Sequence, residues 1–510
     1  MKKVLSLLLI MCSSLTMSGQ QHSLTDSLHY RAELQATMSS GDNTPLWLNA
    51  NKYGLSSLKT ANGYLRGAVY RPLSADNGRK WGVGYGADVA VAAGFTSKLV
   101  VQQAYVEGRW LKGVLTVGAK EYPMELKNQE LSTGAQTLGV NARPIPQVRL
   151  ALPDYWTIPG THNWLALKGH IAYGKTTDDN WQKEFTGQHN KYTQGALYHS
   201  KAGYLRIGNA EKVLFSLELG LEMANQFGGK TYKTENGETV VITNESGIKS
   251  LWHAFIPGGA GSDEVTSDYK NAEGNQLGSW VMRLNYDAND WSLGVYADHF
   301  FEDHSALFMI GYNGYGEGDE WNTKKDSRSF LYDLKDILLG AELNLKQNKW
   351  LKTIVLEYMY TKYQSGPVYH DHSKYISSHI CGLDHYYNHH IFTGWQHWGQ
   401  VIGNPLYRSP LYNNDGDISV ENNRFVAWHL GVSGEPTSQL SYRVLATYQT
   451  GYGTYSNPIY PKQHQGYVLA EGIYKFNNGW SIKGGIGFDF GKLTGDNSGI
   501  QLTIIKRGVL

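Results

Sequence analysis

The chain contains many short segments in which every second residue is apolar. In residues 213–223 the apolar side chains alternate with serine, glutamate and glycine. Residues 480–490 repeat the pattern, with tryptophan, isoleucine and phenylalanine on one face and serine, lysine, glycine and aspartate on the other. A period of two predicts β-strands with two unlike faces. Because unpaired charges are costly in a packed interior, we expect one face to meet lipid and the other a wet lumen.

The connections between these segments alternate between short and long. The short ones are 209–212, 287–290, 347–349, 434–439 and 477–479, and the long ones are 224–278, 302–336, 362–423 and 450–466. Transmembrane β-barrels have this plan, with tight periplasmic turns and extended external loops. The pattern therefore predicts an all-β fold: a transmembrane antiparallel barrel in the bacterial outer membrane.

Alternation of inner and outer connections gives about eighteen strands, an even number that returns both termini to the periplasm. Proline interrupts the sixth strand, where it removes ladder donors. The predicted strands lie near 28–38, 64–71, 81–93, 99–110, 113–119, 136–150, 163–173, 202–209, 213–223, 279–287, 291–301, 337–347, 350–361, 424–433, 440–449, 467–476, 480–490 and 499–507. With no internal repeat or linker, residues 21–510 are predicted to form a single barrel domain.

The first 20 residues are predicted to be an export signal, since Lys2 and Lys3 precede an apolar stretch at 5–11 and small residues at 16–19. A lipoprotein signal at Cys12 would need a small residue at the preceding position. Met11 stands there instead, so we do not expect a lipidated cysteine. After cleavage only Cys381 remains, so the mature chain can form no internal disulfide.

Composition excludes several other classes of protein. Mean hydropathy is -0.41 and no stretch of 18 apolar residues occurs, which excludes a helical membrane protein. The net charge of +1 gives no support for a nucleic-acid partner. Tryptophans that directly follow predicted periplasmic turns are expected to form a girdle at the headgroup level. They are Trp81, Trp164, Trp291, Trp350 and Trp480.

Three segments carry a resemblance to a known family. Residues 44–54 (TPLWLNANKYG), 141–148 (NARPIPQV) and 394–406 (GWQHWGQVIGNPL) resemble those of the capsule assembly Wzi family in its Bacteroidetes branch. The resemblance implies an eighteen-stranded outer-membrane barrel with lectin-like function, which helps to attach or organise capsular polysaccharide. Enterobacterial members carry periplasmic helical segments before or beside the barrel, whereas here the first predicted strand closely follows the cleavage site.

One predicted external loop, 362–423, is rich in histidine and aromatic residues. Aromatic faces can stack on pyranose rings while histidine, asparagine and arginine bond the hydroxyl groups. We expect Trp395 and Trp398 to be exposed there. The candidate polysaccharide-binding residues are Tyr386, Tyr387, His389, His390, Trp395, His397, Trp398, Asn404 and Arg408. Two alternatives stay open: a solvated loop without a ligand, and a metal site at His370 and His372.

The lumen is a second candidate surface. The alternation places His29, Arg31, Glu33 and Gln35 inside, and likewise Arg283, Glu342, Glu357, Arg443 and Lys483. Mixed charges of this kind are expected to cross-brace the barrel through ion pairs. The alternative is a track for an acidic polymer that uses the arginines.

No motif for catalysis or a cofactor is found. The chain lacks the zinc-protease motif, the serine-hydrolase elbow and a phosphate-binding loop, and Ile418 replaces the glycine that a calcium loop at Asp415 and Asp417 would need. We expect a non-enzymatic protein. An outer-membrane hydrolase stays a rival, although it would need a nucleophile or paired acids placed together and no such spacing is found. A porin or transporter for saccharides or other small solutes stays open. It would need an open lumen, whereas the many bulky residues in the long loops favour occlusion. The expected partners are surface polysaccharide, the outer-membrane bilayer and the barrel-assembly machinery, for which the last strand is needed to close the barrel.

Overall fold

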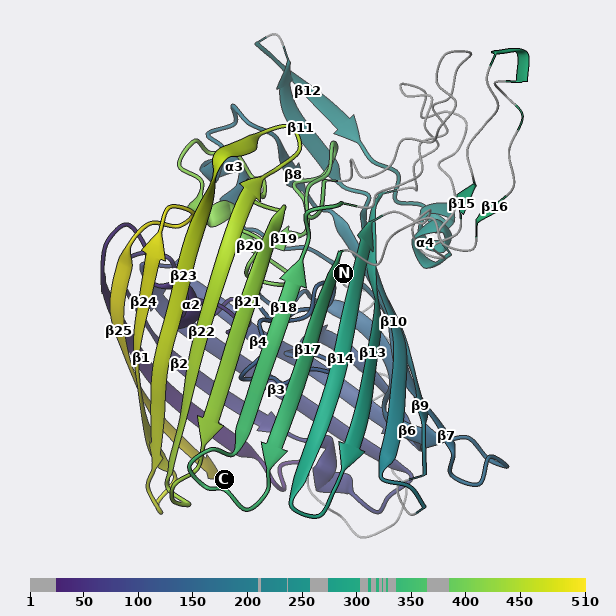
Figure 1. The fold of residues 1–510 in the computed structure, drawn as a ribbon, viewed down its shortest axis with the longest axis vertical. Helices are drawn as coiled ribbons and strands as arrows, with labels where there is room; N and C mark the ends of the chain where they lie inside the picture. The colour runs from purple at the N-terminus through teal and green to yellow at the C-terminus, as the bar shows by residue number, and fades with distance from the viewer. Residues whose placement is uncertain are drawn as a thin grey trace.

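The computed structural model describes residues 24–209, 212–235, 237–256, 274–302, 311–312, 318–320, 323, 327–328, 336–364 and 385–510. Eighteen long strands form one closed sheet (Figure 1). They are β1 (His29–Ser40), β2 (Ala61–Arg71), β3 (Trp81–Ala93), β4 (Leu99–Trp110), β5 (Gly113–Ala119), β6 (Gln147–Thr157), β7 (Leu165–Lys175), β9 (Leu197–Ile207), β10 (Phe215–Phe227), β13 (Asn275–Asp287), β14 (Trp291–Glu302), β17 (Ile337–Leu345), β18 (Thr353–Tyr360), β21 (Phe425–Gly434), β22 (Leu440–Gly453), β23 (Pro458–Lys475), β24 (Trp480–Gly491) and β25 (Asn497–Val509).

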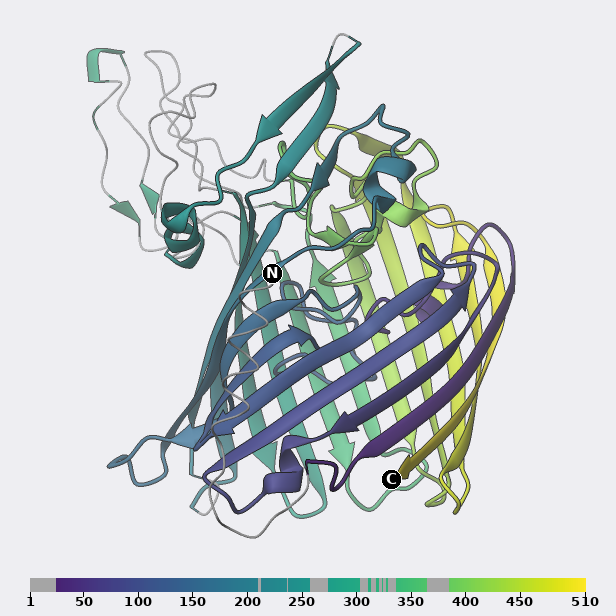
Figure 2. The ribbon, with the colours of Figure 1, turned by 180° about the vertical axis from the view of Figure 1, so that it is seen from behind.

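Each barrel strand pairs antiparallel with the next barrel strand along the chain. The first and last strands close the barrel, with register running from His29 opposite Val509 to Ser40 opposite Ser498. Closure leaves no unpaired edge. The turns at 209–212, 287–290, 347–349, 434–439 and 477–479 lie at one end, here named the turn rim. The long connections lie at the other end, the loop rim, together with short turns at 94–98, 454–457 and 492–496. The C-terminus lies at the turn rim (Figure 2).

The smaller elements belong to the connections. They are α2 (Leu46–Asn49), α3 (Trp181–Phe185), β8 (Tyr192–Gln194), β11 (Lys230–Glu235), β12 (Glu238–Thr243), α4 (Ile248–Phe255), β15 (Gly311–Tyr312), β16 (Ser327–Arg328), β19 (Gln396–His397) and β20 (Gln400–Val401), with short 3-10 turns at Leu73–Asp76, Gly318–Glu320 and Pro410–Tyr412. In the described part of the chain, no helix is long and apolar enough to cross a bilayer.

The predicted two-faced pattern is confirmed. On β24, Trp480, Ile482, Ile486, Phe488 and Phe490 all point outward and are 41–55% exposed, whereas Asp489 points inward and is 4% exposed. The five tryptophans predicted to form a girdle are all exposed and lie at or just before the start of a strand. The outer wall therefore presents an apolar band with tryptophan at the turn rim.

Two sequence expectations about the strands are wrong in detail. The sixth strand was expected at 136–150 but runs as β6 over Gln147–Thr157, because the prolines at 144 and 146 end the preceding inserted segment. The expected long loop at 450–466 is a hairpin instead. There β22 and β23 keep pairing as far as Gly453 opposite Pro458, so the sheet projects beyond the loop rim.

The expectation of a wet lumen is also wrong over much of the barrel. Three segments fold inward and fill it: α2 with its flanks, residues 120–146, and residues 385–423. We call these three segments the plug. Their apolar side chains form one core with inward-facing residues of the wall. It includes Trp47, Leu48, Leu131, Ile145, Tyr386, Tyr387, Trp395, Leu406 and Tyr407.

Candidate functional site

Of the aromatic loop predicted as an external binding surface, residues 385–423 lie inside the barrel as part of the plug. Tyr386, Tyr387, Trp395 and Asn404 are all fully buried. The indole Nε1 of Trp395 donates to the Thr137 carbonyl at 3.0 Å. The expected exposure of Trp395 is therefore wrong. Residues 385–423 fold back into the lumen, where their buried rings are packed and their polar atoms form hydrogen bonds.

The other buried candidates are held equally firmly. Tyr387 stacks on Tyr407 with ring centroids 4.0 Å apart, and its backbone N–H donates to a Glu302 carboxylate oxygen at 2.6 Å. The Asn404 amide donates to the Thr133 hydroxyl and the Gly134 carbonyl, both at 3.0 Å. Tyr386 donates its hydroxyl to Asp336 at 3.0 Å. These groups stabilise the plug and present no ring face to solvent.

His397 joins two inserted segments. Its Nδ1 donates to the carbonyl of Arg143 at 2.8 Å, and its Nε2 accepts from the backbone N–H of Thr177 at 3.1 Å. This arrangement requires the neutral ring with its proton on Nδ1. Burial lowers the pKa of His397 to about 4, which keeps the ring neutral near pH 7. We name this unit the His397 clasp.

The remaining candidates lie near the loop rim. His390 is exposed, and its ring lies 4.4 Å from that of His389. Burial and the neighbouring Lys191 lower the pKa values of both histidines. Arg408 is already paired with Glu421. Trp398 is half-buried under the Arg143 guanidinium, whose carbon lies 4.2 Å from the ring centroid.

The metal alternative receives no support from the described residues. His370, His372 and His379, and also Cys381, lie outside the described residues. Within the described ranges, no three histidine, cysteine, aspartate or glutamate side chains are placed to hold a metal ion.

The charged residues expected to face the lumen do so, and they cross-brace the wall. Arg283 pairs with Glu342 at 3.0 Å. Arg443 and Lys483 share Glu471, each at 2.8 Å. Of the other three charged residues, Arg31 pairs with Glu33, and Glu357 accepts a hydrogen bond from the Tyr296 hydroxyl at 2.7 Å. The expected cross-bracing is therefore confirmed by the ion pairs of Arg31 with Glu33, of Arg283 with Glu342, and of Arg443 and Lys483 with Glu471.

A cavity that the sequence did not single out lies between the plug and the wall. It has a volume of about 100 Å³ and is bounded by residues 120–145 on one side and by β6, β7, β9 and β10 on the other. Its lining mixes aromatic rings with polar and charged groups. The main contributors are Lys120, Tyr122, Glu125, Arg143, Gln147, Arg149, His170, Tyr198, Tyr204 and Glu222. We name it the lumenal cavity.

Tyrosine rings and cations lie against one another where the plug meets this part of the wall. The Arg149 guanidinium lies 3.9 Å from the ring centroid of Tyr122, and the Lys120 ammonium lies 4.7 Å from that of Tyr105. Lys168 continues the series, at 4.5 Å from Tyr155. Cation–π contacts of this kind hold the rings in fixed orientations. The alternation of side chains along β6 could have identified Arg149 as an inward-facing residue. Its partner Tyr122 could not have been identified in this way, because it comes from the inserted segment 120–146.

Several polar atoms of the lumenal cavity lack a partner. Among the described residues, no hydrogen bond reaches Arg149 Nε, Gln147 Oε1 or Glu222 Oε2, although the other Glu222 oxygen accepts from the Tyr204 hydroxyl at 2.8 Å. Arg149 also has no carboxylate within ion-pair distance in the described ranges. Buried polar atoms are normally satisfied, by protein, water or ligand. The cavity therefore offers both donors and acceptors beside aromatic faces.

No protein-family model matches the sequence, and no curated protein sequence matches it. Solved structures do match. The chain is similar to Wzi of Escherichia coli, described as an outer membrane protein involved in group 1 capsule assembly and a carbohydrate-binding β-barrel. The TM-score is 0.56 at 12% identity, over 93% of this chain and 83% of that one.

Two barrels of Pseudomonas aeruginosa match less well. OccK2 matches with a TM-score of 0.45 at 10% identity, over 95% of this chain and 98% of its own. OprD matches with a TM-score of 0.42 at 10% identity, over 95% of both chains. At these identities the likeness concerns the fold alone. The chain is therefore an eighteen-stranded β-barrel with the fold of outer-membrane barrels, and its own loops fill much of the lumen.

Proposed function

We propose that the protein is a non-enzymatic, carbohydrate-binding barrel of the outer membrane that holds or organises capsular polysaccharide at the cell surface. In this proposal the signal peptide directs export, the barrel-assembly machinery inserts the chain, and the turn rim faces the periplasm. The observation that carries the proposal is a plugged lumen with a partly unsatisfied, aromatic-lined cavity. A binding protein needs such a cavity but does not need an open path.

The plug is fastened to the wall on several sides. Lys127 and Asp298 form a fully buried ion pair at 2.7 Å, and the backbone N–H of Gln136 donates to the same carboxylate at 3.1 Å. From α2, the indole of Trp47 donates to the Thr447 hydroxyl at 3.0 Å. Removing one partner of a buried ion pair leaves an uncompensated charge and strongly destabilises the folded plug. A plug held in this way argues against free diffusion through the barrel.

The chemistry of the lumenal cavity suits a sugar. Pyranose rings have apolar faces that pack on aromatic rings, and their hydroxyl groups donate and accept hydrogen bonds. Tyr122 and Tyr204 supply rings, while Arg149, Gln147 and Glu222 supply unsatisfied polar atoms. The likeness in fold to a barrel described as carbohydrate-binding supports the same proposal.

A second function is favoured by one observation. Between residues 126–129 of the plug and the wall lies a hollow of about 380 Å³, lined by Lys168, Glu218, Arg283 and Glu342. A charged hollow of this kind would suit a porin that admits small charged solutes. Conductance through the reconstituted protein separates this alternative from binding without transport.

The proposal is tested by binding of purified capsular polysaccharide to the detergent-solubilised protein. Replacing Tyr122 with Leu removes the ring that Arg149 covers, and Arg149→Gln removes the guanidinium. Each change is expected to weaken binding by about 1–3 kcal/mol, by analogy with stacking on nucleic-acid bases.

The matched control is Arg424→Gln. The Arg424 guanidinium also covers a tyrosine, Tyr455, at 4.1 Å from its ring centroid, but this pair does not line the lumenal cavity. Binding by the control should equal that of the wild type. If all three variants bind as tightly as the wild type, the cavity is not the polysaccharide site.

A further inference from the structure

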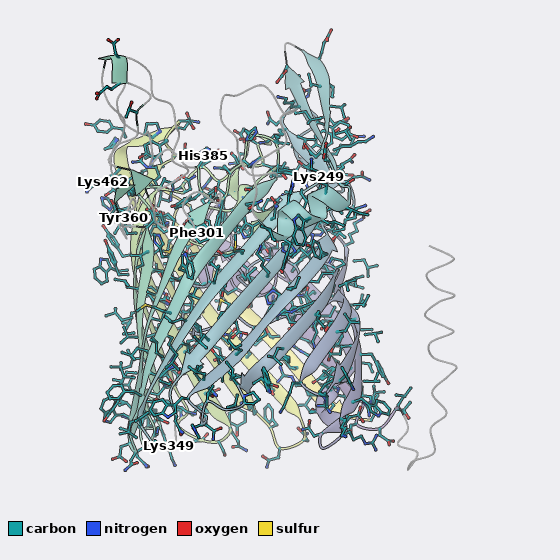
Figure 3. All side chains as sticks on the ribbon, turned by 90° about the vertical axis from the view of Figure 1, so that its right-hand side faces the viewer. Lys249, Phe301, Lys349, Tyr360, His385 and Lys462 are labelled. Carbon is teal, nitrogen blue, oxygen red and sulfur yellow. The ribbon has the colours of Figure 1, made fainter. Side chains whose placement is uncertain are left out.

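Helix α4 lies against the outside of the barrel wall, near the loop rim (Figure 3). Tyr173 of β7 donates its hydroxyl to the carbonyl of Leu251 at 2.9 Å. Lys201 of β9 donates to the Phe255 carbonyl, with its ammonium 5.0 Å from that residue's ring centroid. His199, between them, is fully buried.

These contacts come from outward-facing positions of the wall. Along β9, His199 and Lys201 alternate with Tyr198 and Ser200, and the latter two line the lumenal cavity. Along β7, Tyr173 lies two residues beyond Ile171, an outward-facing side chain that is 40% exposed. Side chains two apart on a strand share a face. The helix therefore covers the same face of the barrel that carries the apolar band.

The opposite side of α4 is apolar and uncovered. Ile248, Trp252 and Ile256 recur at a spacing of four and are 88%, 58% and 47% exposed, whereas Ser250 and Ala254 are buried. A spacing of four places Ile248 and Trp252 on one face of α4, and Ile256 follows directly at the C-terminal cap. Large apolar side chains grouped in this way are seldom left in water.

The charges of the segment are of one sign. Residues 248–256 contain Lys249 and His253 and no acidic residue. Lys249 is exposed (Figure 3), and Lys201 lies at the C-terminal end of the helix. Helices that lie in a membrane interface combine an apolar face with lysine or arginine and bind anionic lipids, and tryptophan is enriched at that depth.

We propose that α4 is an interfacial helix that binds the outer leaflet. Ile248, Trp252 and Ile256 enter the acyl region, and Lys249 contacts the phosphate groups of anionic lipids. The helix thereby fixes the base of the three-stranded sheet β8–β11–β12 to the membrane surface. The inference rests on the proposed placement of the barrel in a membrane and not on polysaccharide binding.

The test measures the depth of a nitroxide label in proteoliposomes. The label is attached at Trp252→Cys in a Cys381→Ser background, and its collision rates with oxygen and with a water-soluble nickel complex are compared. Two further labelled sites serve as references: Phe488→Cys on the outer face of β24, and Val241→Cys on β12, which is 49% exposed.

The oxygen-to-nickel ratio at position 252 should resemble that at 488 and exceed that at 241 several-fold. A water-like ratio at 252 with a lipid-like ratio at 488 overturns the proposal, as does spin–spin broadening that shows a second copy on the helix. A water-like ratio at 488 as well would instead refute the membrane placement. In phosphatidylcholine vesicles, adding phosphatidylglycerol should deepen the label at 252, and Lys249→Gln should abolish this response. An identical response in Lys249→Gln removes the role assigned to Lys249.

Discussion

Replacing Trp395 with alanine should loosen the plug without opening the wall. The ring is fully buried, stacks on Tyr198 at 5.8 Å and donates a hydrogen bond to Thr137. Loss of a buried tryptophan costs about 3–5 kcal/mol, and the orphaned Thr137 carbonyl adds about 1 kcal/mol. Because none of these contacts lies in the barrel ladder, the loss should fall on the plug alone.

Hydrogen exchange of peptides from residues 385–423 measures this loss, since local opening determines the exchange rate of buried amides. A loss of 3 kcal/mol corresponds to exchange on the order of 100-fold faster. Peptides from β24 should exchange as in the wild type. Trp398→Ala is the control, because that ring is only half-buried and its hydrogen bond to Thr177 is long, at 3.4 Å. Equal exchange in the wild type and Trp395→Ala would refute the assignment of Trp395 to the plug core.

Three further predictions concern pH, a buried charge and topology. The folded-state pKa of His397 is about 4, below the unfolded value near 6.5, so the unfolded state binds the extra proton and the clasp loses stability as the pH falls below about 6.5. At pH 5 the loss is about 2 kcal/mol, and exchange around residue 397 should accelerate in the wild type but not in His397→Asn. Lys127→Ala should lower plug stability by about 3–5 kcal/mol, because the Asp298 carboxylate stays buried without its partner. Lys346→Ala removes one partner of an exposed pair and should lower stability by under about 1 kcal/mol. Equal hydrogen exchange of the plug in both variants would contradict this. A protease site in the β11–β12 hairpin should be cleaved on intact cells and one at 477–479 should not, and the reverse result would invert the orientation.

The barrel wall could be predicted because the alternation of apolar and polar residues within each strand decides which side chains face outward. The alternation in residues 480–490 decides which side chains face outward, and the structure places all of the named ones there. The number of strands follows from counting such segments and requiring an even total. Two predicted boundaries are wrong. At 136–150 prolines interrupt the alternation, and at 450–466 the two strands extend as a hairpin through residues predicted to form a loop.

Bulky residues in the long loops favoured an occluded lumen, but the contacts of the plug could not be predicted because they join residues that are distant in sequence. Nothing around Trp395 shows that its indole will meet Thr137 rather than solvent. The lumenal cavity combines Tyr122 from an inserted segment with Arg149 and Tyr204 from two strands. Helix α4 was hidden within the expected link 224–278, where only its spacing of apolar residues could have marked it. A long connection carries no periodic signal that tells an outward loop from an inward one.

A barrel that binds polysaccharide without passing solutes should be closed to ions. Single-channel recording of the wild-type protein in planar bilayers tests it most directly, because the plug crosses the path that ions would take. We expect no stable conductance steps in the wild type, with the folded barrel verified by its heat-modifiable migration. Stable, ohmic channels in the unmodified protein would contradict the account and establish a porin.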